Sequence, residues 1–156
     1  LLSISDSLEV TSSHGIHLRC DALASQVDLA DYALMFLPGG MPGTLNLGAS
    51  ALVTDEVRRR SAAGQPLAAI CAAPSILAEH GALQARHATA NPGFMDAIAA
   101  GGALMSEAAV VRDANLITSR GMGTATELGF EIIRLLLGDD AEQVVASVKQ
   151  GIVYQR

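Results

Sequence analysis

Cys71 stands where its sulfur could act as a nucleophile. An apolar run at 67–70 has the length of a buried strand, and two alanines then lead the chain into an apolar helix that Gly81 ends. A cysteine at such a strand-to-helix turn is presented above the carboxyl edge of a sheet, where the amides and dipole of the helix start stabilise a thiolate. The alternative is a buried cysteine that simply ends a core strand.

Two glycines follow the preceding strand. The run at 32–37, YALMFL, predicts a strand buried on both faces, and Gly39 and Gly40 come just after it. Glycine lets backbone amides approach a ligand closely and point at developing negative charge, so this loop is a candidate oxyanion hole. An ordinary loop is the other interpretation, because a pair of glycines is a weak signal.

Three sequence motifs stand in the order and spacing of a known family. They are LPGGMPG at 37–43, AAICAAPSILAEHG at 68–81 and TSRGMGTA at 118–125. The chain resembles the ThiJ/PfpI superfamily, also called the DJ-one/PfpI family, and within it the bacterial branch of deglycases and glyoxalase III-like proteins. The likeness runs from about Leu8 to the end of the chain.

The resemblance implies a flavodoxin-like α/β fold, with a mostly parallel sheet covered by helices on both faces. The alternation of strands and helices favours the same architecture. The resemblance also implies that the amides of Gly39, Gly40 and Ala72 surround the reacting oxygen beside Cys71. Asn91 stands where relatives often have His or Tyr at the border of the cysteine pocket, and it cannot act as a base.

Arg120 has two interpretations. It could anchor a carboxylate or an oxygen of an oxidised cysteine, or it could form a structural pair at a dimer interface, which we favour. Met122, two residues further on, replaces the proline usual in the family.

The family resemblance places a glutamate on a first strand and helix, where its carboxyl hydrogen-bonds the cysteine. This chain begins at LLSIS and resembles the family from its second strand onward. We therefore expect one domain over 1–156 that is incomplete at its N-terminus and lacks a strand from the middle of the sheet.

The implied activity of the full-length protein is a glyoxalase or deglycase reaction that needs no cofactor. Cys71 would attack a 2-oxoaldehyde such as methylglyoxal, or its early adduct with an amine, and water would release lactate. A cysteine peptidase or amidotransferase-like hydrolase is less favoured, because Ala72 stands where the peptidase-like members have histidine. The alternatives are an oxidative-stress sensor or holdase chaperone that works through oxidation of Cys71, and an inactive scaffold.

Composition excludes some other classes. The chain has 156 residues, of which 50% are hydrophobic and 3% aromatic, which suits one aliphatic core. A net charge of −6 argues against a nucleic-acid surface, and the triplet at 58–60 is interpreted as a solvated helix face. Apolar runs are too short to span a bilayer, and two cysteines suit a cytoplasmic protein.

No metal motif occurs in the sequence. His14 and His17 are interpreted as surface imidazoles, and Cys20 as a structural residue or a secondary oxidation site. A homodimer is expected from the resemblance.

The pattern predicts the remaining elements. We expect two strands around a turn at 12–15, a helix over 52–64 with Glu56 and the arginines outside, a strand at 88–90, a hairpin at 110–118, a helix opened by a capping box at Thr124 and Glu127, and a helix over 140–149.

Overall fold

The core of the molecule is a four-stranded sheet. The computed structural model describes residues 1–155. The strand order is β5-β6-β10-β9, in which β5, β6 and β10 are parallel and β9 is antiparallel to β10. The bounds are β5 Met35–Leu37, β6 Leu67–Ile70, β9 Val110–Asp113 and β10 Leu116–Ser119. The predicted α/β fold with a mostly parallel sheet is confirmed.

Smaller strand pairs and the helices surround this sheet. The two-stranded pairs are β1 Leu2–Ser3 with β4 Ala22–Leu23, β2 Glu9–Thr11 with β3 His17–Arg19, and β7 His87–Ala88 with β8 Leu104–Met105. The helices are α1 Gly43–Ala49, α2 Ala51–Ala63, α3 Pro74–Glu79, α4 Met95–Ala100, α5 Ala125–Leu137 and α6 Ala141–Gly151. Short 3₁₀ helices cover Ala24–Gln26, Leu29–Asp31, Pro92–Phe94, Met122–Thr124 and Gly138–Asp140.

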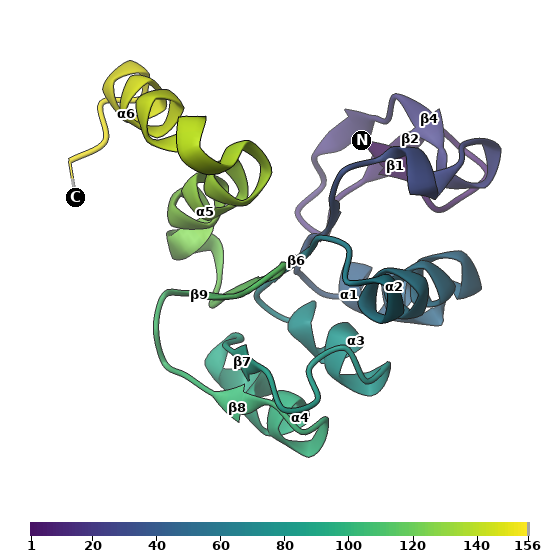
Figure 1. Cartoon of the computed structure of the whole chain (residues 1–156). Coiled ribbons are helices and arrows are strands. Elements are labelled where there is room, and N and C mark those ends of the chain that lie inside the picture. The colour runs from purple at the N-terminus through teal and green to yellow at the C-terminus, as the bar shows by residue number, and fades with distance from the viewer. Residues whose placement is uncertain (156) are drawn as a thin grey trace.

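Helices lie on both faces of the central sheet. In Figure 1, α1 to α4 lie on one side of the sheet and α5 and α6 on the other. Alternation along β6 explains how one strand serves both layers. Leu67 and Ala69 join the core on the side of α2 and α3, whereas Ala68 and Ile70 pack with Leu128 of α5.

A groove of about 510 Å³ separates β1 from β5. Apolar side chains from both strands line it, among them Leu2, Met35 and Phe36. Each strand pairs on its other side, β1 with β4 and β5 with β6. Two statements remain predictions: that residues 1–156 form one domain, and that a strand is missing from the middle of the sheet.

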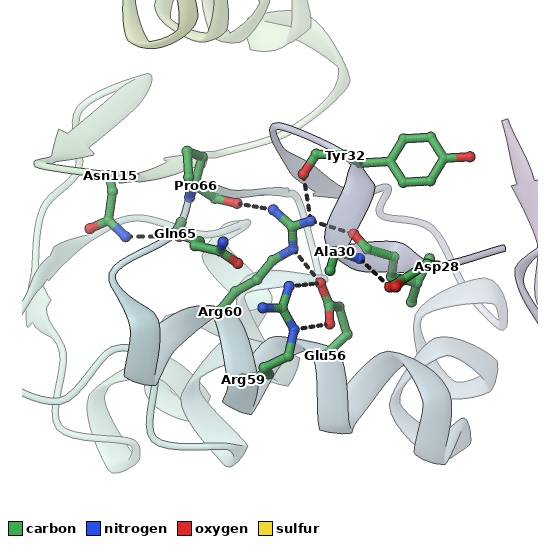
Figure 2. A network of polar contacts seen from close by, with 10 residues as sticks. Asp28, Ala30, Tyr32, Glu56, Arg59, Arg60, Gln65, Pro66 and Asn115 are labelled. Carbon is green, nitrogen blue, oxygen red and sulfur yellow. Dashed lines mark hydrogen bonds and ion pairs between the residues drawn. The ribbon is translucent and has the colours of Figure 1, made fainter.

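One prediction about α2 is wrong. The helix was expected to carry Glu56 and the three arginines outside. Arg58 and Arg59 are exposed as expected, but the exposed fractions are 7% for Glu56 and 1% for Arg60. Figure 2 shows the reason, since the Arg60 guanidinium points into the fold and not into solvent. Its Nε donates to Glu56 at 2.6 Å, and the same carboxylate accepts from Arg59 at 2.7 Å. The other guanidinium nitrogens of Arg60 donate to the main-chain carbonyls of Leu29, Tyr32 and Pro66.

Three local predictions also need correction. Only Met35–Leu37 of the run at 32–37 is a strand, and it is not buried on both faces, because Phe36 is 43% exposed beside two hollows of the surface. The strand expected at 88–90 is His87–Ala88. Thr124 forms no capping box with Glu127, because its hydroxyl is hydrogen-bonded to Ser119 at 2.6 Å.

The other element predictions are confirmed. The hairpins at 9–19 and 110–119 are antiparallel. Helix α2 ends at Gly64, whose φ of 64° is the left-handed conformation that glycine tolerates. Helices α5 and α6 begin and end within two residues of the expected positions. No helix among the described residues has both the length and the apolar character needed to cross a membrane.

Candidate functional site

Cys71 lies on the sharp turn that the sequence predicted. It follows β6 directly and has φ of 65°, a left-handed conformation that residues with a Cβ rarely adopt. Hydrogen bonds hold this backbone from both sides: its N–H donates to Ser119 O at 2.9 Å, and its carbonyl accepts from Asn91 N–H at 2.9 Å. The side chain is half-buried. The turn therefore fixes the sulfur at the carboxyl edge of the sheet.

The loop after β5 lies directly against this turn. A Cβ built on Gly39 would stand 2.5 Å from the Cβ of Cys71 and 2.6 Å from Ile70 O, so only glycine fits there. Gly40 has φ of 95°, which also favours glycine, and its carbonyl accepts hydrogen bonds from Thr44 N–H and Oγ1 at 2.8 and 3.0 Å. The close approach of two backbones explains why glycines end this strand.

Three backbone amides gather near the cysteine. Gly39, Gly40 and Ala72 come from two different loops, and Ala72 is 1% exposed. Within residues 1–155, the N–H groups of these three residues donate no hydrogen bond to the protein. Such amides can donate to an oxygen that gains negative charge.

A pocket of about 530 Å³ opens at Cys71. Its walls come from β5, the loop after it, α5 and the hairpin β2–β3. They are mostly apolar, and the two ionisable side chains that line it are Cys71 and His14. The lining residues are Ser13, His14, Phe36, Gly39, Gly40, Ile70, Cys71, Met122, Ala125, Leu128, Gly129 and Ile132.

Three candidate residues lie outside this lining: Ala72, which is buried next to Cys71, and the two side chains Asn91 and Arg120. Asn91 is joined to Cys71 through its backbone, but its side-chain Oδ1 accepts from Gly93 N–H at 3.1 Å and starts a 3₁₀ turn. The guanidinium of Arg120 donates to Glu107 O at 2.9 Å within the same chain. Arg120 therefore ties a loop to its neighbour, and its place at a dimer interface stays a prediction.

Sequence reasoning missed part of the pocket. It did not assign Phe36, Met122 or His14 to the site. Met122 lines the pocket of Cys71 and has an exposed fraction of 91%. An exposed large apolar residue next to a glycine motif is a usable signal, but only once the fold brings it to the site. The described residues contain no cluster of three or more His, Cys, Asp or Glu side chains placed to hold a metal ion.

The fold and the site together define a class: an α/β protein with a cysteine on a left-handed strand-to-helix turn, packed against the glycine loop of the adjacent strand. The chain belongs to the DJ-1/PfpI family, whose model matches residues 2–135.

Individual relatives agree with this assignment. The chain is 36% identical over 137 residues to protein dj-1beta of Drosophila melanogaster, covering 88% of this chain and 73% of the relative. It is 30% identical to a deglycase of Pyrococcus abyssi, covering 81% and 76%. The solved structure of oxidized Toxoplasma gondii DJ-1 has a TM-score of 0.88 and 32% identity, covering 99% of this chain and 82% of that one. Four other relatives are longer, and the match spans between 31% and 64% of their length.

Proposed function

We propose that the protein is a cofactor-independent, cysteine-dependent glyoxalase or deglycase that acts on 2-oxoaldehydes such as methylglyoxal or on their early amine adducts. The observation that carries the proposal is Cys71 on its left-handed turn, half-buried at a pocket of about 530 Å³. Membership of a family that includes the Pyrococcus abyssi deglycase supports it.

The first step would be addition of the Cys71 sulfur to the aldehyde carbon. A carbon–sulfur bond forms, and the carbonyl electron pair moves to oxygen. The amides of Gly39, Gly40 and Ala72 would donate hydrogen bonds to that oxygen. The hemithioacetal then rearranges to a thioester as one proton moves from the first carbon to the second and the hydroxyl proton moves from the first oxygen to the second. Water hydrolyses the thioester and gives lactate.

The rearrangement needs a group that moves protons. The family resemblance assigns this role to a glutamate that precedes the region matched here. The assay should therefore include a version of the chain that carries this glutamate segment, in which residues 1–156 would supply the nucleophile and the oxyanion-binding amides.

The test is consumption of methylglyoxal and formation of lactate without glutathione. Cys71→Ser should reduce turnover by at least about 100-fold, because a serine hydroxyl is a far weaker nucleophile than a thiolate. The matched control is Cys20→Ala, which removes the other, buried cysteine and should keep turnover within about 2-fold. Equal turnover in wild type and Cys71→Ser, or none in wild type, would contradict the proposal.

A second candidate is a sensor or holdase chaperone that works through oxidation of Cys71. The half-buried thiol and the amides beside it favour this candidate, since the same amides could hold a sulfinate. The Toxoplasma relative is described in an oxidized form.

We further propose that the protein is a cytoplasmic homodimer. The helices α5 and α6 carry exposed apolar side chains, including Leu137 at 46% and Val148 at 36%. Such a face gains stability when a second copy covers it. Light scattering of the purified protein should give twice the monomer mass, and a monomer at micromolar concentration would contradict this.

A further inference from the structure

The hairpin β2–β3 brings a histidine to the Cys71 pocket. His14 lies in the turn that joins the two strands, 57 positions before Cys71 in the sequence, yet both line the same pocket. The turn is ordered by hydrogen bonds from Gly15 N–H to Ser12 O at 3.0 Å and from Ser12 N–H to Ile16 O at 2.9 Å. Gly15 has φ of 74°, which suits the tight reversal. The position of His14 is therefore set by the hairpin.

The imidazole of His14 is oriented by its neighbour. Nδ1 lies 3.1 Å from Ser13 Oγ, within hydrogen-bond distance. Among the described residues, Nε2 has no hydrogen-bond partner in the protein, and the ring is exposed, so this nitrogen is open to solvent and to a molecule in the pocket. A ring with one nitrogen held and the other available is arranged as acid–base histidines are.

The His14 imidazole matters because, among residues 1–155, Cys71 is the only other ionisable side chain that lines the pocket. Most of the other side chains that line the pocket, such as Phe36, Leu128 and Ile132, are apolar. The glycine loop with Cys71 and the turn with His14 both contribute to this lining, so a small 2-oxoaldehyde bound there could contact both. The first step of the proposed reaction leaves a negative charge on the aldehyde oxygen, and a general acid speeds the step by protonating it.

We propose that His14 is a catalytic residue of this site, a role that rests on the proposed function. As the Cys71 sulfur bonds to the aldehyde carbon, the carbonyl electron pair goes to oxygen and the Nε2 proton of the His14 imidazolium transfers to it. The products are a neutral hemithioacetal and a neutral imidazole. When water later hydrolyses the thioester, the thiolate and the carboxylate of lactate form and two protons are released. One returns to His14 and the other goes to solvent.

The test compares three variants with wild type in methylglyoxal turnover. His14→Ala removes the ring, and His14→Gln keeps hydrogen bonding but cannot transfer a proton. Both should lower kcat/KM by about 100-fold, the usual contribution of a general acid. His17→Ala is the matched control, because His17 lies on the same hairpin, is paired with Thr11 Oγ1 at 3.0 Å and does not line the pocket. It should stay within about 2-fold of wild type.

A second measurement separates proton transfer from damage to the site. Iodoacetamide alkylates Cys71 without creating an alkoxide, so its rate should change by less than about 2-fold in the His14 variants. Unchanged turnover in His14→Ala would overturn the inference. So would an equal loss of alkylation and turnover, or an equal loss in His17→Ala.

The two proposals can fail separately. If wild type turns over methylglyoxal and the His14 variants match it, only the role of His14 fails. If wild type shows no turnover, the proposed function fails, and protection of Cys71 from iodoacetamide by methylglyoxal then decides about His14. Half-protection should need about 10-fold more methylglyoxal in His14→Ala than in wild type, for loss of one hydrogen bond to the bound oxygen. Equal protection would overturn the inference.

Discussion

Gly39 and Cys71 are packed backbone against side chain, so closely that a methyl group on Gly39 would stand 2.5 Å from the Cβ of Cys71. Two loops from adjacent strands meet at this point. Their contact couples the conformation of the glycine loop to the position of the sulfur.

Gly39→Ala should disturb both stability and activity. The added methyl must displace the Cys71 turn or Ile70 O, at a cost of about 1–3 kcal/mol, typical of overpacking. Turnover should fall by at least about 10-fold, because the sulfur and the amides no longer align. Gly43→Ala is the control, since a Cβ there meets nothing within 4 Å. Denaturant unfolding and methylglyoxal turnover measure the two effects, and equal behaviour of the two variants would contradict the prediction.

The left-handed backbone of Cys71 should carry a measurable strain. Glycine adopts φ of 65° without the penalty of about 1–2 kcal/mol that a Cβ brings. Cys71→Gly should therefore be more stable than Cys71→Ala by about 1 kcal/mol, although both lack the thiol. Thermal or denaturant unfolding of the pair is the measurement. If Cys71→Ala proves the more stable of the two, the turn is not strained.

Peroxide should distinguish the two cysteines. Cys71 is half-buried at a pocket, whereas Cys20 is 7% exposed inside the fold. Access and thiolate character govern oxidation, so Cys71 should gain oxygen first. Peptide mass spectrometry after graded peroxide would show this order. Oxidation of Cys20 before Cys71, or of both at the same rate, would weigh against the sensor function.

Arg60→Met should be among the most destabilising changes on α2. It removes the buried partner of Glu56 and leaves main-chain carbonyls without their donor, for which about 3–5 kcal/mol is typical. Arg58→Met is the matched control: its pair with Asp55 is exposed, and the loss should be below about 1 kcal/mol. Both values come from denaturant unfolding. Similar losses would show that burial of Arg60 contributes little.

The same cluster should make stability depend on acid. The hydrogen bond from Arg59, aided by Arg60, lowers the pKa of Glu56 from its usual value of 4.5, although burial opposes the shift. A carboxyl with a lowered pKa in the folded state stabilises the protein above pH 4.5, and this contribution disappears as pH falls through the lowered pKa. Glu56→Gln should therefore lose stability at pH 7 and flatten the decline below pH 4.5. An unchanged acid profile would contradict this.

How far the sequence predicts this structure depends on the range of the contacts involved. The elbow at Cys71 and the end of α2 at Gly64 follow from local patterns, because short-range sterics decide them. Arg60 could not be placed in this way. A run of three arginines resembles a solvated face, and the distant carbonyls of Leu29 and Tyr32, which help to make a buried guanidinium favourable, cannot be read from the local pattern.

His14 shows the same limit at the site. The turn that holds it was predicted correctly, but its place beside Cys71 depends on the path of a hairpin across the carboxyl edge of the sheet. Local periodicity carries no information about that path. The sequence therefore indicated the candidate nucleophile, Cys71, but it did not indicate that His14 lines the same pocket.

The hydrogen bonds of Arg60 also predict which positions of the cluster can vary in evolution. The acceptors at positions 29, 32 and 66 are backbone carbonyls, which every amino acid carries, so changes of side chain there leave the acceptors in place. Position 60 has no such freedom. A lysine keeps the charge but lacks the planar fork that serves a carboxylate and several carbonyls at once. The residues at positions 29, 32 and 66 should therefore vary among relatives, whereas position 60 should remain arginine.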